Sequence, residues 1–111
     1  METVLTKYKH CDMVKVSGRV DSLTAPKLVE ELNKITTSGH FKIVVDLSEI
    51  QFLSSAGLRI LIATQKHCKR YNRGEVVLAA VPENILAVFE LAGFTSIFKI
   101  FDDVISAVGA F

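Results

Sequence analysis

The chain lacks the features that mark secreted, membrane-spanning or disulfide-bonded proteins. Its first residues, METVLTKYKHCD, have no apolar core of the kind a secretory signal needs, and no apolar run reaches the length of a transmembrane span. Cys11 and Cys68 are the only cysteines, and the pairs His10-Cys11 and His67-Cys68 lack the spacing of a zinc site. We therefore expect a cytoplasmic protein with reduced thiols, no bound metal and no direct membrane insertion.

A surplus of charge of either sign is also missing. The 111 residues carry 13 lysines and arginines against 12 aspartates and glutamates, a formal net charge of +1. Nucleic-acid binding needs a clustered basic surplus, so nucleic acid is not expected as a partner. One basic cluster, formed by Lys69, Arg70 and Arg73, falls at the expected end of a helix, where cations complement the helix dipole.

Motifs of familiar enzyme classes are absent as well. The sequence has no G-x-S-x-G elbow, no G-x-x-x-x-G-K-[ST] phosphate loop and no G-x-G-x-x-G dinucleotide fingerprint. The adjacent carboxylates Glu30-Glu31 and Asp102-Asp103 fall on positions expected to be solvated or capping. We therefore expect a protein that is not an enzyme and that needs no cofactor.

What the chain does contain is a regular alternation of strand and helix patterns. Two strands open it as a hairpin, and the unbroken apolar run Ile43-Val44-Val45 is typical of a central strand covered on both faces. The expected order is β-β-α-β-α-β-α-β-α. This is an α/β fold with a mostly parallel sheet of four to five strands and about four helices, in one domain over residues 1–111.

Capping residues and apolar spacing assign the helix boundaries and faces. Thr24 is a favourable N-cap for the first helix, with Pro26 in its first turn, and Asp102 is the expected cap of the last helix. The third helix opens at Pro82 and is expected to face the core with Ile85, Val88, Phe89 and Ala92.

Ser55 stands where a strand connection becomes the second helix. Serine is a preferred N-cap, a role that Ser54 could fill equally well. Free N–H groups and the positive end of the helix dipole also make this an anion site. They would stabilise a phosphate on Ser55 by roughly 0.3–1 kcal/mol if exposed. Gly57 would leave room for a kinase or partner backbone. On these residues alone, capping and modification are equally supported.

The second helix begins with a strongly apolar run. Three of its residues suffice for a core-facing stripe, whereas Ile60 and Ala63 point to other sides. These two side chains either pack under a neighbouring helix or leave apolar surface beside the serine. An apolar patch next to a modifiable serine is what a phosphorylation-controlled interface requires.

The segment VVDLSEIQFLSSAGLRIL resembles the signature of the STAS domain, which bacterial anti-sigma factor antagonists share with the cytoplasmic tails of sulfate transporters. The earlier segment GRVDSLTAPKL resembles a second motif of the family, and the resemblance extends over essentially the whole chain. It implies a STAS fold and the function of an anti-sigma factor antagonist.

The resemblance also implies a phosphorylation switch. Matching Gly57-Leu58 to the family's Gly-Leu places Ser55 at the phosphoacceptor and Asp21 at a loop aspartate near it. In the family, the unphosphorylated antagonist binds an anti-sigma factor serine kinase and releases a sigma factor to permit transcription. A PP2C-type phosphatase restores this form. The partner-binding surface expected from the match comprises Asp21, Ser22, Leu23, Thr24, Ser54, Ala56, Gly57, Leu58, Arg59 and Ile60.

One residue departs from the family pattern, and one alternative function stays open. Ser54 stands where the best-known antagonists carry aspartate, which removes a negative charge beside the acceptor. Lone STAS domains also serve as constitutive, unphosphorylated subunits of lipid-transport or other ATPase complexes. Nucleotide binding by the domain itself has no phosphate loop to support it, so we expect a flat ATP or GTP titration.

Overall fold

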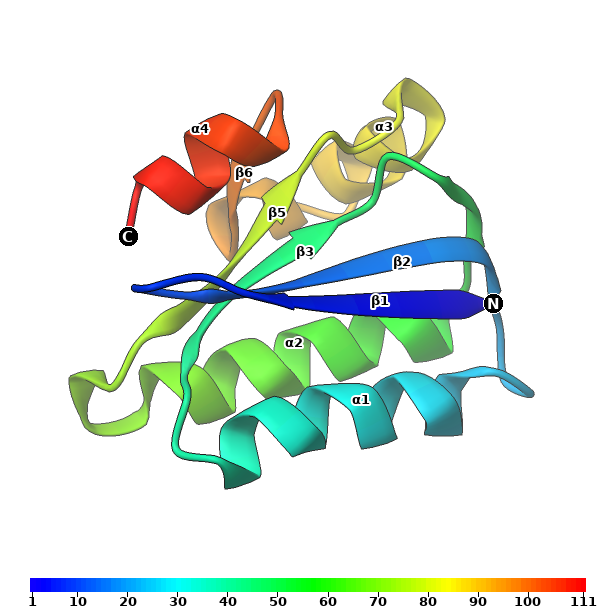
Figure 1. Ribbon diagram of the computed structural model, residues 1–111. Helices are drawn as coiled ribbons and strands as arrows, with labels where there is room; N and C mark the ends of the chain where they lie inside the picture. Colours follow the sequence, from blue (N-terminus) through cyan, green and yellow to red (C-terminus); the bar gives the residue numbers. More distant parts are fainter.

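Six strands form one mixed sheet at the centre of the molecule. The computed structural model describes residues 1–111, and its strands follow the order β1-β2-β3-β5-β6, with β4 paired to β2 off this path (Figure 1). β1 and β2 are antiparallel, and the other pairs are parallel. The strands are β1 (Glu2–Lys7), β2 (Asp12–Val20), β3 (Lys42–Asp46), β4 (Ile50–Leu53), β5 (Glu75–Ala79) and β6 (Lys99–Phe101).

Helices cover both faces of this sheet. The four α-helices are α1 (Ala25–Thr37), α2 (Ser55–Lys69), α3 (Glu83–Leu91) and α4 (Val104–Gly109). Two short 3-10 turns, η1 (Arg70–Asn72) and η2 (Phe94–Ser96), follow α2 and α3. In Figure 1, α1 and α2 lie side by side under the sheet and α4 lies on the opposite face. The α/β class, the mostly parallel sheet and the four helices confirm the prediction from sequence.

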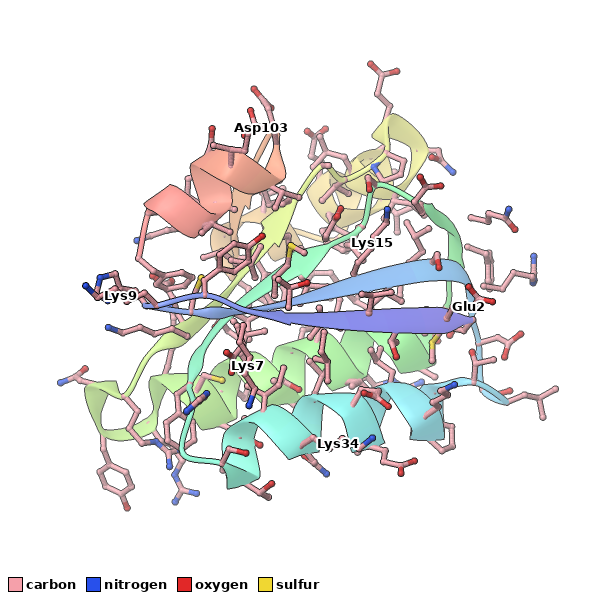
Figure 2. All side chains as sticks on the ribbon, in the orientation of Figure 1. Glu2, Lys7, Lys9, Lys15, Lys34 and Asp103 are labelled. Atoms are coloured by element: carbon pink, nitrogen blue, oxygen red, sulfur yellow. The ribbon has the colours of Figure 1, made fainter.

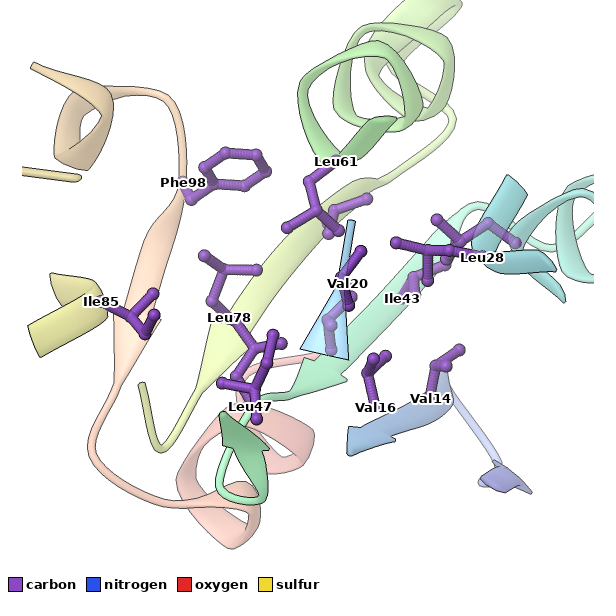
Figure 3. Close-up of a cluster of buried hydrophobic side chains, with 14 of the residues drawn as sticks. Val14, Val16, Val20, Leu28, Ile43, Leu47, Leu61, Leu78, Ile85 and Phe98 are labelled. Atoms are coloured by element: carbon purple, nitrogen blue, oxygen red, sulfur yellow. The ribbon is translucent and has the colours of Figure 1, made fainter. Parts of the chain in front are cut away.

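Alternation along the central strands produces two cores. Ile43 and Val45 of β3 face the larger one, which α1, α2 and α3 cover, whereas Val44 faces the smaller one under α4. Figure 3 shows Leu28, Leu61 and other buried side chains of the larger core meeting over the strands. The unbroken apolar run of β3 is thus explained by helices on both sides, as expected for a central strand.

The sequence predicts four to five strands, and the structure has six because of β4. Residues Asp12 to Lys15 of β2 pair with β3, but the end of β2 runs beyond that strand. There Arg19 pairs with Phe52 and Val20 with Leu53. With four residues, two of them exposed, β4 carries too little apolar pattern to be distinguished from a connection.

Two capping predictions are corrected. Asp103, not Asp102, caps α4, because its Oδ1 accepts the Ser106 N–H at 2.7 Å. Thr24 occupies the N-cap position of α1 as expected, but its side chain makes no capping hydrogen bond; its hydroxyl donates to the Arg19 carbonyl at 3.0 Å instead.

The expected inward face of α3 is also too wide. Ile85 and Phe89 are buried, whereas Val88 is 54% exposed and Ala92 is exposed. α3 therefore meets the core along a single narrow stripe. None of the helices combines the length and apolarity that crossing a membrane requires.

Candidate functional site

The junction between β4 and α2 divides two roles between two serines. Ser54 is the N-cap of α2, because its Oγ accepts the Gly57 N–H at 3.2 Å. Its own N–H donates to the Val20 carbonyl at 2.8 Å, which ties the junction to the end of β2. Ser55 is the first helical residue and is exposed. The hydroxyl of Ser55 is therefore not used for capping.

Arg59 is the neighbour of Ser55 one helical turn further on. Its Nε donates to the Ser55 carbonyl at 3.3 Å, and its Nη2 lies 3.5 Å from the Ser55 Oγ. Both side chains are exposed. The N-terminal turn of α2 thus places a guanidinium beside an exposed hydroxyl that does not cap the helix.

Gly57 serves internal packing. It is buried, and a Cβ added there would lie 2.6 Å from Cγ1 of Val20 and 2.7 Å from Cδ1 of Leu53. The missing side chain lets α2 approach β2 and β4 closely, which holds the serine junction against the sheet. Gly57 faces inward, so it does not open space for a partner as the sequence suggested.

The loop after β2 lies at the same edge of the sheet and is internally fixed. Oδ1 of Asp21 accepts the N–H groups of Leu23 at 3.0 Å and Thr24 at 3.1 Å. The Thr24 hydroxyl in turn accepts the Asp21 N–H at 2.9 Å. The hydrogen bond from the Thr24 backbone N–H, followed by that from Leu23, lowers the pKa of the Asp21 carboxyl below its usual value.

This loop begins beside the serine junction. Val20 pairs with Leu53 and accepts the Ser54 N–H, so the chain leaves β2 next to the start of α2. At the loop's tip Leu23 is 89% exposed. The structure therefore brings the predicted Asp21–Thr24 loop and the predicted helix start to one edge of the sheet.

Two residues outside the predicted partner surface contribute to this edge. The guanidinium carbon of Arg19 lies 4.4 Å from the ring centroid of Phe52, within the range of a cation–π interaction. Phe52 is 38% exposed, so an apolar ring and a cation are presented together. The sequence does not indicate their strand pairing, because the four residues of β4 carry too little apolar pattern to mark a strand.

The apolar start of α2 is mostly covered. Leu58, Ile60 and Ile62 are partly buried and pack against the larger core. Ile60 also lines a shallow groove between α1 and α2, with Val29 on the facing helix. Apolar surface at this edge comes mainly from Leu23 of the loop and from the Phe52 ring, not from the helix.

Metal-binding and thiol chemistry have no counterpart at this edge. No group of three His, Cys, Asp or Glu side chains lies close enough together to hold a metal ion. Cys68 is fully buried in the larger core, and desolvation raises the pKa of its thiol to about 11. Burial likewise raises the pKa of Cys11, in the smaller core. Both thiols behave as packed apolar groups.

Comparison with known proteins identifies the family. A family model described as "Mlab, STAS domain" matches residues 4–100. The chain belongs to the STAS domain family. The fold and the family expected from sequence are thereby confirmed.

Two curated relatives are homologous over most of the chain. A candidate anti-sigma factor antagonist of Bordetella bronchiseptica, BtrV, is 34% identical over 96 residues, which cover 86% of this chain and 82% of BtrV. The anti-sigma-B factor antagonist of Listeria monocytogenes is 30% identical over 91 residues, 82% of this chain and 78% of that protein. Anti-sigma factor antagonists are binding proteins rather than enzymes, in agreement with the expectation from sequence.

Solved structures reproduce the architecture. An anti-sigma factor antagonist from Mycobacterium paratuberculosis is 26% identical and superposes with a TM-score of 0.87, over 98% of this chain and 92% of that chain. A chain of the Acinetobacter MlaFEDB complex, at 18% identity and a TM-score of 0.66 over 87% of this chain and 98% of that chain, shares the fold.

Proposed function

We propose that this chain is an anti-sigma factor antagonist whose binding to an anti-sigma factor serine kinase is switched by phosphorylation of Ser55. The observation that carries the proposal is the division of roles between two serines. Ser54 caps α2 and leaves the Ser55 hydroxyl exposed. In its unphosphorylated form the protein binds the kinase, and a sigma factor is released to permit transcription.

When Ser55 is unphosphorylated, this edge of the sheet offers a partner two exposed apolar side chains, Leu23 and Phe52, with the cation of Arg19 beside them. Leu23 projects from a loop held by the Asp21 carboxylate, and Phe52 is stacked under Arg19. A preorganised loop loses little conformational entropy on binding, which favours affinity. Ser54, where the best-known antagonists carry aspartate, leaves this edge with one fewer negative charge.

Phosphorylation would change this edge in charge and in bulk. A phosphate adds about −1.5 to −2 charges at pH 7, and the N-terminal dipole of α2 favours it. Arg59 is placed to pair with a phosphate on Ser55, since its Nη2 is already 3.5 Å from the hydroxyl. The modification is thus tolerated by the free protein but disfavours the complex through desolvation and steric conflict. A PP2C-type phosphatase would reverse it.

A binding experiment with the kinase tests the proposal. The kinase and ATP should place one phosphate on Ser55, located by peptide mass spectrometry. Ser55→Asp should weaken the complex by at least about tenfold, and Ser55→Ala should bind like the parent protein but accept no phosphate. Ser96→Asp, at an exposed serine of η2, is the charge-matched control and should bind normally. Phosphate on another residue, or undiminished binding by Ser55→Asp, would refute the switch.

A second candidate function is a constitutive subunit of a transport ATPase complex. It is supported by the family model's description and by the shared fold with a chain of the Acinetobacter MlaFEDB complex. Ser55 would then be a contact residue that stays unmodified. Intact mass of the protein from its own cells, before and after phosphatase treatment, separates the two. A mass that falls by one phosphate supports the switch. An unchanged mass together with co-purification of an ATPase supports the constitutive subunit.

A further inference from the structure

The end of the molecule opposite Ser55 contains a pocket that the proposed function does not use. It has a volume of about 220 Å³ and is formed by the β1–β2 turn, the α1–β3 loop and the segment after α2. These segments meet at one end of the ribbon in Figure 1, and Figure 2 shows Lys9 there. The 15 residues of α2 separate this end from Ser55 by about 22 Å.

Arg73 is held at this pocket in a fixed orientation. Its Nε donates to the Arg70 carbonyl at 3.0 Å, and its Nη2 donates to the His67 carbonyl. The guanidinium carbon also lies 3.9 Å from the ring centroid of Phe41. An arginine has five N–H donors, and only two of these bonds are made here, so three donors stay available to a ligand.

The turn that delivers Arg73 is conformationally unusual. Tyr71 and Asn72 both have positive φ, 57° and 56°; asparagine tolerates this region, whereas for tyrosine it costs about 1–2 kcal/mol. Gly74 follows directly, and a Cβ there would collide with the carbonyl oxygen of Phe41. The turn is therefore pressed against the α1–β3 loop in a strained conformation, and such strain clusters at functional sites.

The charge lining the pocket is positive. Lys9 and Lys42 line it together with Arg73. The only carboxylate is that of Asp12, which is 5% exposed and has its Oδ2 2.7 Å from Nδ1 of His40. Asp12 is thus held against His40, and its single negative charge leaves a surplus of positive charge from the three permanent cations.

We propose that this pocket binds a small anionic ligand through a phosphate group, with Arg73, Lys9 and Lys42 as the phosphate-binding residues. Arg73 supplies planar, oriented donors, and the two lysines supply charge. The half-exposed Tyr8 ring lines the same pocket and offers a surface for a short organic group. The volume lies below the usual range for drug-sized ligands, about 300–1,000 Å³, which favours a phosphate with little attached to it.

Helix capping alone does not account for the arrangement. Arg73 donates to the carbonyl of His67, in the last turn of α2, and to that of Arg70, the C-cap residue; such bonds are a known role for a cation at a helix end. That role uses neither Lys9 nor Lys42, nor the remaining donors of the guanidinium. The C-terminal end of α1 also lies near the pocket, but its Ile35 carbonyl already accepts the N–H groups of Ser38 and His40 and does not need the lysines as donors.

Titration of the ¹⁵N-labelled full chain tests the proposal, with inorganic phosphate and glycerol 3-phosphate as probes. Both should produce saturable shifts in the amide signals of residues 8–12, 39–42 and 73. Sodium chloride of matched ionic strength should not produce them. The Lys9→Glu, Lys42→Glu double variant should bind at least about fivefold more weakly. Lys27→Glu, at an exposed lysine in the first turn of α1, should bind like the parent.

The titration results distinguish the class of ligand and can refute the proposal. Tighter binding of the ester than of inorganic phosphate identifies a phosphorylated small molecule as the ligand class, and equal binding identifies free phosphate. Shifts confined to the start of α2, shifts equal in sodium chloride, or binding unchanged in the double variant would overturn the proposal. Because the probes act at the end opposite Ser55, kinase binding by Ser55→Ala reports on the proposed function separately.

Discussion

The two ends of α2 are built from opposite chemistry. At its N-terminus the helix exposes N–H groups, which need hydrogen-bond acceptors, and the Ser54 hydroxyl accepts the Gly57 N–H. At its C-terminus the helix exposes carbonyls, and Arg73 donates to them. The polarity of one helix thus makes one end suited to an added negative charge and gathers fixed cations at the other.

The two ends also differ in what is left over once the helix is capped. At the serine end the unused group is a single neutral hydroxyl, which can change its charge only by modification. At the opposite end the unused groups are permanent cations around a pocket. The first end is therefore suited to a switch by modification, and the second to constitutive binding of an anion.

Replacing a glycine at each end of α2 by alanine should produce the largest changes in the free energy of unfolding. Gly74→Ala forces a Cβ into the Phe41 carbonyl oxygen, so backbone must move, and we expect a loss of about 3 kcal/mol in the free energy of unfolding. Gly57→Ala meets only the side chains of Val20 and Leu53, and should cost about 1–2 kcal/mol. Urea denaturation measures both.

Gly109→Ala provides the control for these two variants. A Cβ at Gly109 has no atom within 4 Å, and the residue lies at the end of a helix, so stability should stay the same or rise slightly. A Gly57→Ala variant less stable than Gly74→Ala would show that the serine end is the tighter of the two.

The serine pair should show a smaller, asymmetric effect. Ser54→Ala removes the acceptor of the Gly57 N–H and should lower the free energy of unfolding by about 1 kcal/mol. Ser55→Ala removes no cap and should change it by less than about 0.5 kcal/mol. Thermal and urea unfolding of the two variants, side by side, measure the difference. Equal losses would mean that Ser55 shares the capping role and that its hydroxyl is not free.

The smallest effect should come from the Asp21 loop as the pH is lowered. The folded-state pKa of Asp21 is below its unfolded value, so its contribution to stability is present above about pH 4 and is lost as pH falls through the folded pKa. Asp21→Asn keeps an oxygen acceptor for the Leu23 and Thr24 N–H groups but does not titrate.

Urea unfolding between pH 7 and pH 3 tests this sign. The parent protein should be the more stable of the two at pH 7, and the difference should shrink as the pH is lowered. A difference that does not vary with pH would mean that hydrogen bonding to the loop does not depend on the charge of Asp21. Asp103, whose pKa is lowered by the Ser106 N–H, lies outside this edge and supplies a comparison carboxylate.

Much of the fold was accessible from local patterns because they repeat over many residues. The apolar run of β3 and the helical spacing of α1 each reflect burial of a whole face, which leaves a strong periodic signal. Single atoms leave no such signal. Asp102 and Asp103 are equally good caps by residue type, and so are Ser54 and Ser55. Which of each pair caps its helix is decided by the backbone geometry at the helix start.

The candidate site divides in the same way. The motif around Ser55 and the loop at Asp21 could be found in the sequence, since the resemblance to STAS domains rests on contiguous residues. Arg19 and Phe52 could not, because they meet only through the pairing of β4 with β2, across 33 positions of sequence. The pocket at Arg73 likewise joins three segments that are distant along the chain.

By itself the sequence determined the class of fold, the family and the position of the serine, because periodic burial and contiguous motifs are local properties of the chain. Only the tertiary structure decided that the Ser55 hydroxyl does not cap α2, that Gly57 faces the sheet, and that three cations share a pocket at the far end of α2. These features depend on which segments the parallel sheet brings together, and that pairing is set by the packing of the whole domain.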